Sequence, residues 1–378
     1  MKRNNWIFFL PLVLFSCSGP KNLTGEKELP SLKKMFQQDF HIGAALSAPQ
    51  IQQKDSATNR LIQKQFGSIT AENIMKCEVI HPEWNRYSFE LADQFVDYGR
   101  KNRMFIVGHT LIWHSQLSPF VQKIKNRDSM QLFMENHIRT IVSRYKGKVN
   151  GWDVVNEALN EDGTYRKSIF YELLGEDFII TAFRLAQEAD PGAALYYNDY
   201  NIEQPKKRAG AIAIIKKLQA AGVRVDGVGI QGHWRSYKVP LQDIEESIRD
   251  FAALGVKVHF TELDLGVLPN PWDSDAADVN MKAEYSAKMN PYAGGLPDSV
   301  ATQQAGSYGE LFRLFLKYKD EIDRVTFWGV HDGQSWLNGW PIRGRTNYPL
   351  LFDRKLQPKP AFFKVTETKT NPSSRKSF

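Results

Sequence analysis

The feature that most constrains the fold of this chain is an alternation of short apolar runs with segments of helical periodicity. Eight runs rich in β-branched and aromatic residues occur in order: FHIGAALS from Phe40, FGSITAEN from Phe66, FIVGHTLIW from Phe105, VNGWDVVNE from Val149, ALYYNDYN from Ala194, GVGIQGHW from Gly227, KVHFTELDL from Lys257 and RVTFWGV from Arg324. Between them lie helical repeats, for example Leu241, Ile244, Ile248 and Phe251. Strands that alternate with helices indicate a parallel sheet, and eight such units predict an α/β fold, a single (β/α)8 TIM barrel.

The two ends of the chain differ in composition from this repeating region. Residues 1–17 join a basic start to an apolar stretch that ends in LFSC. This pattern predicts a lipoprotein-type signal peptide with lipidation at Cys17, the alternative being an ordinary signal peptide. Residues 18–30 are expected to form a linker, 31–365 the barrel and 366–378 a flexible tail. Residues 266–300, with Pro, Asn, Asp and Gly, predict an extended loop after strand 7 or a small subdomain.

Charge and cysteine content exclude several classes of partner. The 49 basic and 42 acidic residues leave a net charge of +7, part of it in the leader and the tail. We therefore expect no nucleic acid, and contact with a membrane only through a lipid anchor in a bacterial cell envelope, facing the periplasm or the outer surface. Only Cys77 remains after Cys17, so neither a disulfide nor a Cys-based metal site is expected within one chain. We expect a monomer without a cofactor.

Polar side chains gather at the ends of the predicted strands, where a barrel of this kind builds its active site. They are Glu72 and Asn73, His109 and Trp113, Asn156 and Glu157, Asn198 and Asp199, Gln231 and His233, Glu262 and Asp264, and Trp328. Glu157 and Glu262 lie on different strands. Paired carboxyl groups hydrolyse glycosides: one protonates the leaving oxygen while the other attacks or stabilises the anomeric centre.

Aromatic residues at the same rim support a carbohydrate substrate, because their flat faces can stack on sugar rings. They are Trp113, Trp328, Trp336, Trp340 and Tyr200.

Six motifs extend this interpretation: ITAENIMK, HTLIWHSQ, WDVVNEALNEDG, GIQGHW, HFTELDL and VTFWGV. In this order, over about residues 31 to 365, the chain resembles glycoside hydrolase family 10, the endo-β-1,4-xylanases. The resemblance implies a retaining enzyme that hydrolyses internal bonds of xylan and xylo-oligosaccharides. It implies that Glu157 is the general acid/base and that Glu262 is the nucleophile of a covalent glycosyl-enzyme.

The resemblance also implies roles for the residues around this pair. Asn156 would bind the 2-hydroxyl of the sugar at the cleavage point, His233 would orient Glu262, and Gln231 would lie near Glu157. The remaining expected binding residues are Glu72, Asn73 and Lys76 for the next sugar on the non-reducing side, His109, Trp113, Trp328 and Trp336 as walls, and Tyr200 on the leaving-group side.

Two other functions stay open at this point. One is a related barrel glycosidase that acts on β-glucan or mannan, and the other is a non-catalytic, lipid-anchored glycan-binding protein.

Three histidines also lack a place in the pattern: His331 stands where a small hydroxyl residue is expected, while His114 and His259 are expected to be structural.

The motif WDVVNE sets a geometric condition on the strand that carries it. Neighbouring residues of a regular strand point to opposite faces, yet Asn156 and Glu157 must both reach one sugar. We therefore predict that the pleat breaks there, through a bulge or through the turn into the next loop.

Overall fold

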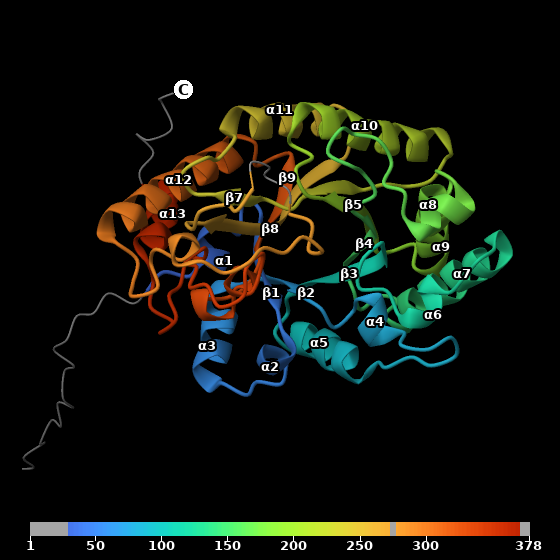
Figure 1. Ribbon diagram of the computed structural model, residues 1–378, viewed down its shortest axis with the longest axis horizontal. Helices are drawn as coiled ribbons and strands as arrows, with labels where there is room; N and C mark the ends of the chain where they lie inside the picture. Colours follow the sequence, from blue (N-terminus) through green and yellow to red (C-terminus); the bar gives the residue numbers. More distant parts are fainter. Residues whose placement is uncertain (1–28, 273–276, 371–378) are drawn as a thin grey trace, which may run out of the picture. The chain divides into compact units, whose positions relative to one another are not determined.

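The computed structural model describes residues 29–272 and 277–370 (Figure 1). The chain divides into two compact units, Met1–Pro30 and Ser31–Phe378. The predicted signal peptide, Cys17 and nearly all of the predicted linker lie outside the described residues. The second unit holds the strands and helices.

Eight parallel strands close into a barrel, as the sequence predicts. Their bounds are β1 His41–Leu46, β2 Ser68–Ala71, β3 Phe105–Trp113, β4 Gly151–Asn156, β5 Ala194–Asp199, β6 Gly227–Ile230, β8 Lys257–Gly266 and β9 Ile322–Phe327. Each pairs with its neighbour in the chain except where β7 intervenes, β1 pairs with β9, and β6 pairs with β8 to complete the ring. Each strand overlaps one of the eight apolar runs.

The sixth run, GVGIQGHW, is interrupted where the sequence predicts one continuous strand. After β6 the chain turns at Gln231 and Gly232, and it resumes as the short strand β7, His233–Arg235, which pairs with the end of β8. Gly232 has a φ of +82°, a conformation that glycine adopts without the strain of a Cβ. Gln231 and His233 lie on either side of this glycine, after β6 and at the start of β7.

Helices cover the outside of the strand ring (Figure 1). The longer ones are α3 Ser56–Gln65, α5 Glu90–Lys101, α7 Arg127–Arg144, α9 Phe178–Ala189, α10 Pro205–Ala220, α11 Leu241–Ala252, α12 Asp298–Lys317 and α13 Pro360–Thr370. The shorter ones are α1 Leu32–Met35, α2 Ala48–Ile51, α4 Cys77–Ile80, α6 Pro119–Gln122 and α8 Ile169–Leu174, with 3-10 turns η1 Ala287–Met289, η2 Asp332–Gln334 and η3 Trp336–Asn338.

Helix α11 illustrates why these segments are helical. Ile244, Ile248 and Phe251 recur on one face and are fully buried against the barrel. Gly255 follows the helix with a φ of +76°, which suits the left-handed conformation that ends many helices.

The end of the barrel domain lies later than the sequence predicts. Helix α13 continues through residues 366–370, which the sequence assigns to a flexible tail. Val365, Thr366 and Thr368 are buried, and Lys369 in the last turn forms an ion pair with Asp39. The predicted tail boundary is therefore wrong, while residues 371–378 lie outside the described residues.

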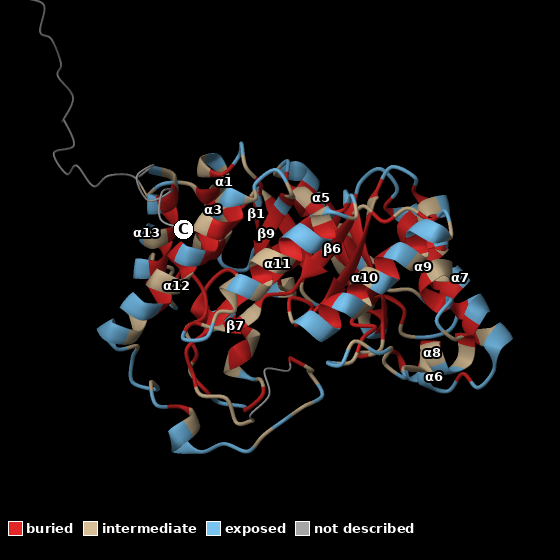
Figure 2. Ribbon diagram, turned by 90° about the horizontal axis from the view of Figure 1, so that it is seen from above, coloured by how far each residue is buried: buried red, intermediate tan, exposed pale blue. Residues whose placement is uncertain are grey.

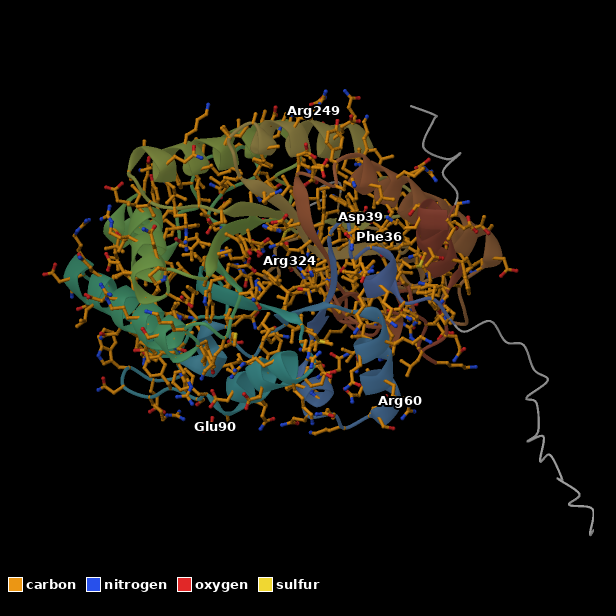
Figure 3. All side chains as sticks on the ribbon, turned by 180° about the vertical axis from the view of Figure 1, so that it is seen from behind. Phe36, Asp39, Arg60, Glu90, Arg249 and Arg324 are labelled. Carbon is orange, nitrogen blue, oxygen red and sulfur yellow. The ribbon has the colours of Figure 1, made fainter. Side chains whose placement is uncertain are left out.

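Side chains pack inside the barrel near the end where the strands begin. Tyr196 on β5 lies so close to Gly151 of β4 that a Cβ there would lie 2.5 Å from the phenol ring. Buried Arg324 lies over the rings of Tyr196 and Phe105, near the centre of the strand ring seen from behind (Figure 3). Within residues 29–272 and 277–370, no helix combines the length and apolarity needed to cross a bilayer.

The segment between β8 and β9 is the longest between two consecutive strands, and its loop before α12 matches the predicted extended loop. The described residues of this loop include the short turn η1 and are mostly of intermediate or exposed character, and the loop lies on the side of β7 (Figure 2). The same loop supplies Ala277 and Val279 to the cleft described below.

Candidate active site

The carboxyl ends of the strands surround a cleft of about 210 Å³. All but one of the residues that were expected to have a catalytic or substrate-binding role line it: Glu72, Asn73, Lys76, His109, Trp113, Asn156, Glu157, Gln231, His233, Glu262, Trp328 and Trp336. The exception is Tyr200. Gln116, Ala277, Val279 and Trp340 complete the lining.

The break in the pleat at Asn156 and Glu157 is confirmed. The register of β4 against β5 shifts between Asp153 and Val155, and β4 ends at Asn156. Glu157 then adopts a φ of +57°, while its N–H still donates to the carbonyl oxygen of Asn198 at 2.9 Å. A non-glycine residue in this left-handed region costs free energy, and such strain concentrates at functional sites. Both side chains consequently reach the same cleft.

Glu157 is buried and held by donors on both oxygens. The indole N–H of Trp113 donates to Oε2 at 2.8 Å, and the amide of Gln231 donates to Oε1 at 3.0 Å. Burial raises the pKa of Glu157, and the negative charge of Glu262 adds to that effect, whereas the two hydrogen bonds oppose it. The group is thus biased toward the protonated form that an acid requires.

Glu262 has the opposite bias. Burial alone would raise the pKa of Glu262, but the hydrogen bond from His233 and the nearby positive charges of His233 and Lys76 outweigh it and lower that pKa. His233 Nε2 lies 3.2 Å from Oε2 of Glu262, and Asn198 donates to Oε1 at 2.9 Å. One carboxyl therefore favours the proton while the other favours the charge, which is the pattern of a divided acid and nucleophile.

His233 is held as a cation by a second carboxylate. Its Nδ1 lies 3.1 Å from Oδ1 of Asp264, whose other oxygen accepts from the indole N–H of Trp336 at 2.8 Å. Burial alone would lower the pKa of His233, but the charge of Asp264 and the hydrogen bonds to Asp264 and Glu262 raise it to about 10. The imidazolium consequently stays charged beside Glu262 across the neutral range.

Asn198 connects the two halves of the site, a role that the sequence reading does not assign. Its Nδ2 donates to Oδ1 of Asn156 as well as to Glu262, each at 2.9 Å, and its Oδ1 accepts from Thr261 at 2.6 Å. The available signal was its position at the end of the fifth strand, between the strands of Asn156 and Glu262.

A second group of polar residues, around Lys76, also lines the cleft. Lys76 Nζ donates to Asn73 Oδ1 at 2.9 Å and to Gln116 Oε1 at 3.0 Å. Burial raises the pKa of Glu72 and lowers that of Lys76. Gln116 was not predicted, because it lies in the loop after β3 and belongs to no polar pair at a strand end. Its φ is +47°.

Indole rings form one wall of the cleft. Trp336 stacks on Trp340 with ring centroids 4.6 Å apart and planes inclined by 18°, while Trp328 meets His109 edge to face at 5.4 Å. His109 itself is fixed by Asp153, whose Oδ2 lies 2.9 Å from its Nδ1. The tryptophans predicted at the rim are thus brought together, Trp340 included.

Tyr200 is the predicted site residue that the structure does not bring into the cleft. It is only 3% exposed, its hydroxyl accepts from Arg166 at 2.8 Å, and Lys207 Nζ lies 3.5 Å from the ring centroid. Tyr200 thus does not line the cleft, and its contact with the leaving-group side of a substrate stays a prediction.

The three unassigned histidines lie outside the carboxylate network. His331 caps η2 by accepting from the N–H of Gly333 at 3.2 Å, which replaces the expected hydroxyl. His259 is fully buried, and burial holds its pKa well below the usual value. His114 is placed near Arg166 and Asp278, and burial, followed by the charge of Arg166, lowers its pKa to about 4.

These features together define a class of protein: a (β/α)8 barrel whose strand ends hold a carboxyl pair of opposite pKa bias inside an aromatic cleft, as in glycoside hydrolases. Among the described residues, no group of three or more His, Cys, Asp or Glu side chains is placed to hold a metal ion.

Comparison with known proteins gives the family. The model described as glycosyl hydrolase family 10 matches residues 31–368. Endo-1,4-beta-xylanase A of Xylanibacter ruminicola is 44% identical over 337 residues, covering 88% of this chain and 91% of that protein. A solved endoxylanase structure of this family from a sugarcane soil metagenome is 42% identical with a TM-score of 0.87, covering 89% of this chain and 99% of that chain. A mutant structure in complex with xylotriose is 33% identical with a TM-score of 0.79, covering 90% and 100%. The chain belongs to glycosyl hydrolase family 10.

Proposed function

We propose that this protein is a retaining endo-1,4-β-xylanase that hydrolyses internal bonds of xylan. The observation that carries the proposal is the opposite pKa bias of Glu157 and Glu262 in one aromatic cleft. The similarity to named xylanases along most of the chain supports xylan as the substrate.

In the first step, Glu262 attacks the anomeric carbon as the bond to the leaving oxygen breaks. Glu157 donates its proton to that oxygen, so the leaving sugar departs as a neutral alcohol. His233 and Asn198 keep Glu262 ionised and aimed until it bonds to the sugar. Asn156, which lies between Glu157 and Asn198, is placed to bind the 2-hydroxyl.

In the second step, the charge of Glu262 is consumed in the glycosyl ester. The repulsion that helped Glu157 retain its proton is then absent, so Glu157 can accept a proton from water. That water attacks the anomeric carbon, the ester bond breaks, and Glu262 leaves as a carboxylate. Two inversions give retention of configuration.

The substrate is tested by reducing-sugar release from xylan, cellulose and mannan at equal polymer concentration. We expect activity on xylan at least about tenfold above either of the others, since each 1.4 kcal/mol of preference for one sugar in the cleft gives a factor of ten. Faster release from cellulose or mannan would identify a related barrel glycosidase. Tight xylan binding without hydrolysis would identify a glycan-binding protein.

We propose further that the chain is exported and anchored in a bacterial envelope through lipid on Cys17, as the LFSC sequence indicates. Expressed in a bacterial host fed with labelled palmitate, the wild type should carry label and partition into membranes. Cys17→Ala should lose both, while Cys77→Ala, a matched change of the other cysteine, should keep them. A wild type without label would indicate an ordinary signal peptide, and equal labelling of the wild type and Cys17→Ala would mean that the lipid is not on Cys17.

We also propose that the enzyme acts as a monomer, because a single chain supplies both carboxylates and their hydrogen-bond partners. Light scattering of the mature protein tests this: a mass near that of one chain is expected, and a dimer at micromolar concentration would contradict it.

A further inference from the structure

Arg166, in the loop that follows β4, touches Glu157 without lining the cleft. Its Nε lies 3.2 Å from the carbonyl oxygen of Glu157, and one terminal nitrogen donates to the hydroxyl of Tyr200 at 2.8 Å and to the carbonyl of Leu159 at 3.4 Å. The guanidinium is thus fixed beside the residue proposed as the acid, through that residue's own backbone.

The other terminal nitrogen of Arg166 reaches a distant part of the chain. It lies 3.2 Å from Oδ2 of Asp278, in the long loop between β8 and α12. The two side chains are only 17% and 21% exposed, so solvent screens the pair less than a surface ion pair. The neighbours of Asp278 in sequence, Ala277 and Val279, line the cleft.

Asp278 favours the charged carboxylate form that pairs with Arg166. Burial alone would raise its pKa, but the N–H of Asn280, which donates to Oδ1 at 2.9 Å, and the charges of Arg166 and His114 lower that pKa. His114 is neutral near pH 7 because its own pKa is about 4. At neutral pH the direct contact is therefore between one guanidinium and one carboxylate, while the nearby charges of Lys207 and Asp199 pair with each other at 3.1 Å.

The charged and titratable groups that act on Glu157 or feel its charge come from several elements. They are Glu262 on β8, Arg166 in the loop after β4, Lys76 before α4, Asp199 at the end of β5, and Tyr197 and Tyr200 on and after β5. Of these groups, Arg166 is the cation whose charge is offset by a carboxylate of the long loop, that of Asp278.

We propose that Arg166 is a positioning residue for Glu157, and that Asp278 balances its charge and thereby couples the long loop to the acid/base function of Glu157. When Asp278 is paired with Arg166, the nearby positive charge is offset and Glu157 keeps its proton more readily. When the pair separates, the unbalanced guanidinium favours the carboxylate form of Glu157.

The sign of the effect follows from this arrangement. Removing the charge of Asp278 leaves Arg166 unopposed, and a nearby cation lowers the pKa of a carboxyl group. The basic limb of the kcat/KM profile reports the acid of the free enzyme, so that limb should move to lower pH. We expect a shift of about half a pH unit, less than the one to three units of a directly contacting pair.

The test is the pH profile of kcat/KM on xylohexaose for the wild type, Asp278→Asn and Asp278→Glu. Asp278→Asn should show the shifted basic limb, whereas Asp278→Glu, which retains the charge, should restore most of it. Glu284→Gln serves as the matched control, because Glu284 is exposed in the same loop. Its profile should overlay that of the wild type.

A second substrate separates charge from damage to the fold. A dinitrophenyl β-xylobioside leaves without a proton, so its kcat/KM at neutral pH should stay within about twofold of wild type in Asp278→Asn. Overlaid xylohexaose profiles for the wild type and Asp278→Asn would overturn the coupling. So would an equal shift in Asp278→Glu or Glu284→Gln, or an equal loss on both substrates.

Glu157 is the acid only under the function proposed above, and the two failures can be told apart. If the wild type hydrolyses neither substrate, the proposed function fails. If the wild type hydrolyses both with a bell-shaped profile that Asp278→Asn leaves unchanged, only the coupling fails.

Discussion

Glu262→Ala is expected to abolish turnover of both xylan and aryl β-xylobiosides, with a loss in kcat on the order of 10⁵-fold, the scale seen when a covalent nucleophile is removed. His233 and Asn198, which bond to Glu262, would remain but would have no carboxylate to direct. Initial rates on the two substrates measure the loss. Because no step of the proposed cycle avoids Glu262, the loss should be similar for good and poor leaving groups.

Chemical rescue makes this expectation specific. Azide can occupy the space of the deleted carboxylate and attack the anomeric carbon once, while Glu157 protonates the leaving oxygen, so the product should be an α-glycosyl azide. Glu90→Ala is the control, since Glu90 is exposed on α5 (Figure 3) and should retain wild-type rates. A residual rate above about one per cent without azide would contradict the assignment, because it would exceed the loss expected for a nucleophile.

The barrel could be predicted from the sequence because each of its strands is a compact apolar run with a helix on either side. The site could be predicted for the same reason, since parallel strand ends meet at one face. Even the irregular backbone at Glu157 followed from asking Asn156 and Glu157 to reach one sugar, and its φ of +57° agrees.

What could not be predicted depends on contacts between loops. Arg166 and Asp278 are 112 positions apart, and neither lies at the end of a strand. Arg166 also donates to the hydroxyl of Tyr200, a loop contact that the position of Tyr200 after the fifth strand did not reveal. The interruption at Gly232 was missed because Val228, Ile230 and Trp234 alternate as in one continuous strand, and only the positive φ of Gly232 reveals the turn.

Glu157→Ala is expected to divide substrates by their leaving groups. On xylan the departing sugar oxygen needs a proton, so kcat/KM should fall by about 10²–10⁴-fold, the usual contribution of a general acid. On a dinitrophenyl β-xylobioside the leaving group needs none, and kcat/KM should stay near the wild-type value. The raised pKa of Glu157, caused by burial and by Glu262, is the physical basis of this division.

The second half of the cycle gives a further signature of the same variant. Without Glu157 no group deprotonates the attacking water, so the glycosyl-enzyme on Glu262 should accumulate and dinitrophenol should appear as a burst followed by a slow phase. Azide, which needs no base, should restore turnover and give a β-glycosyl azide, because two inversions have then occurred. The opposite anomers from the two variants would assign the two carboxyl groups independently of any rate. Equal loss on both substrates for Glu157→Ala, or an α-azide from it, would mean that Glu157 is not the acid.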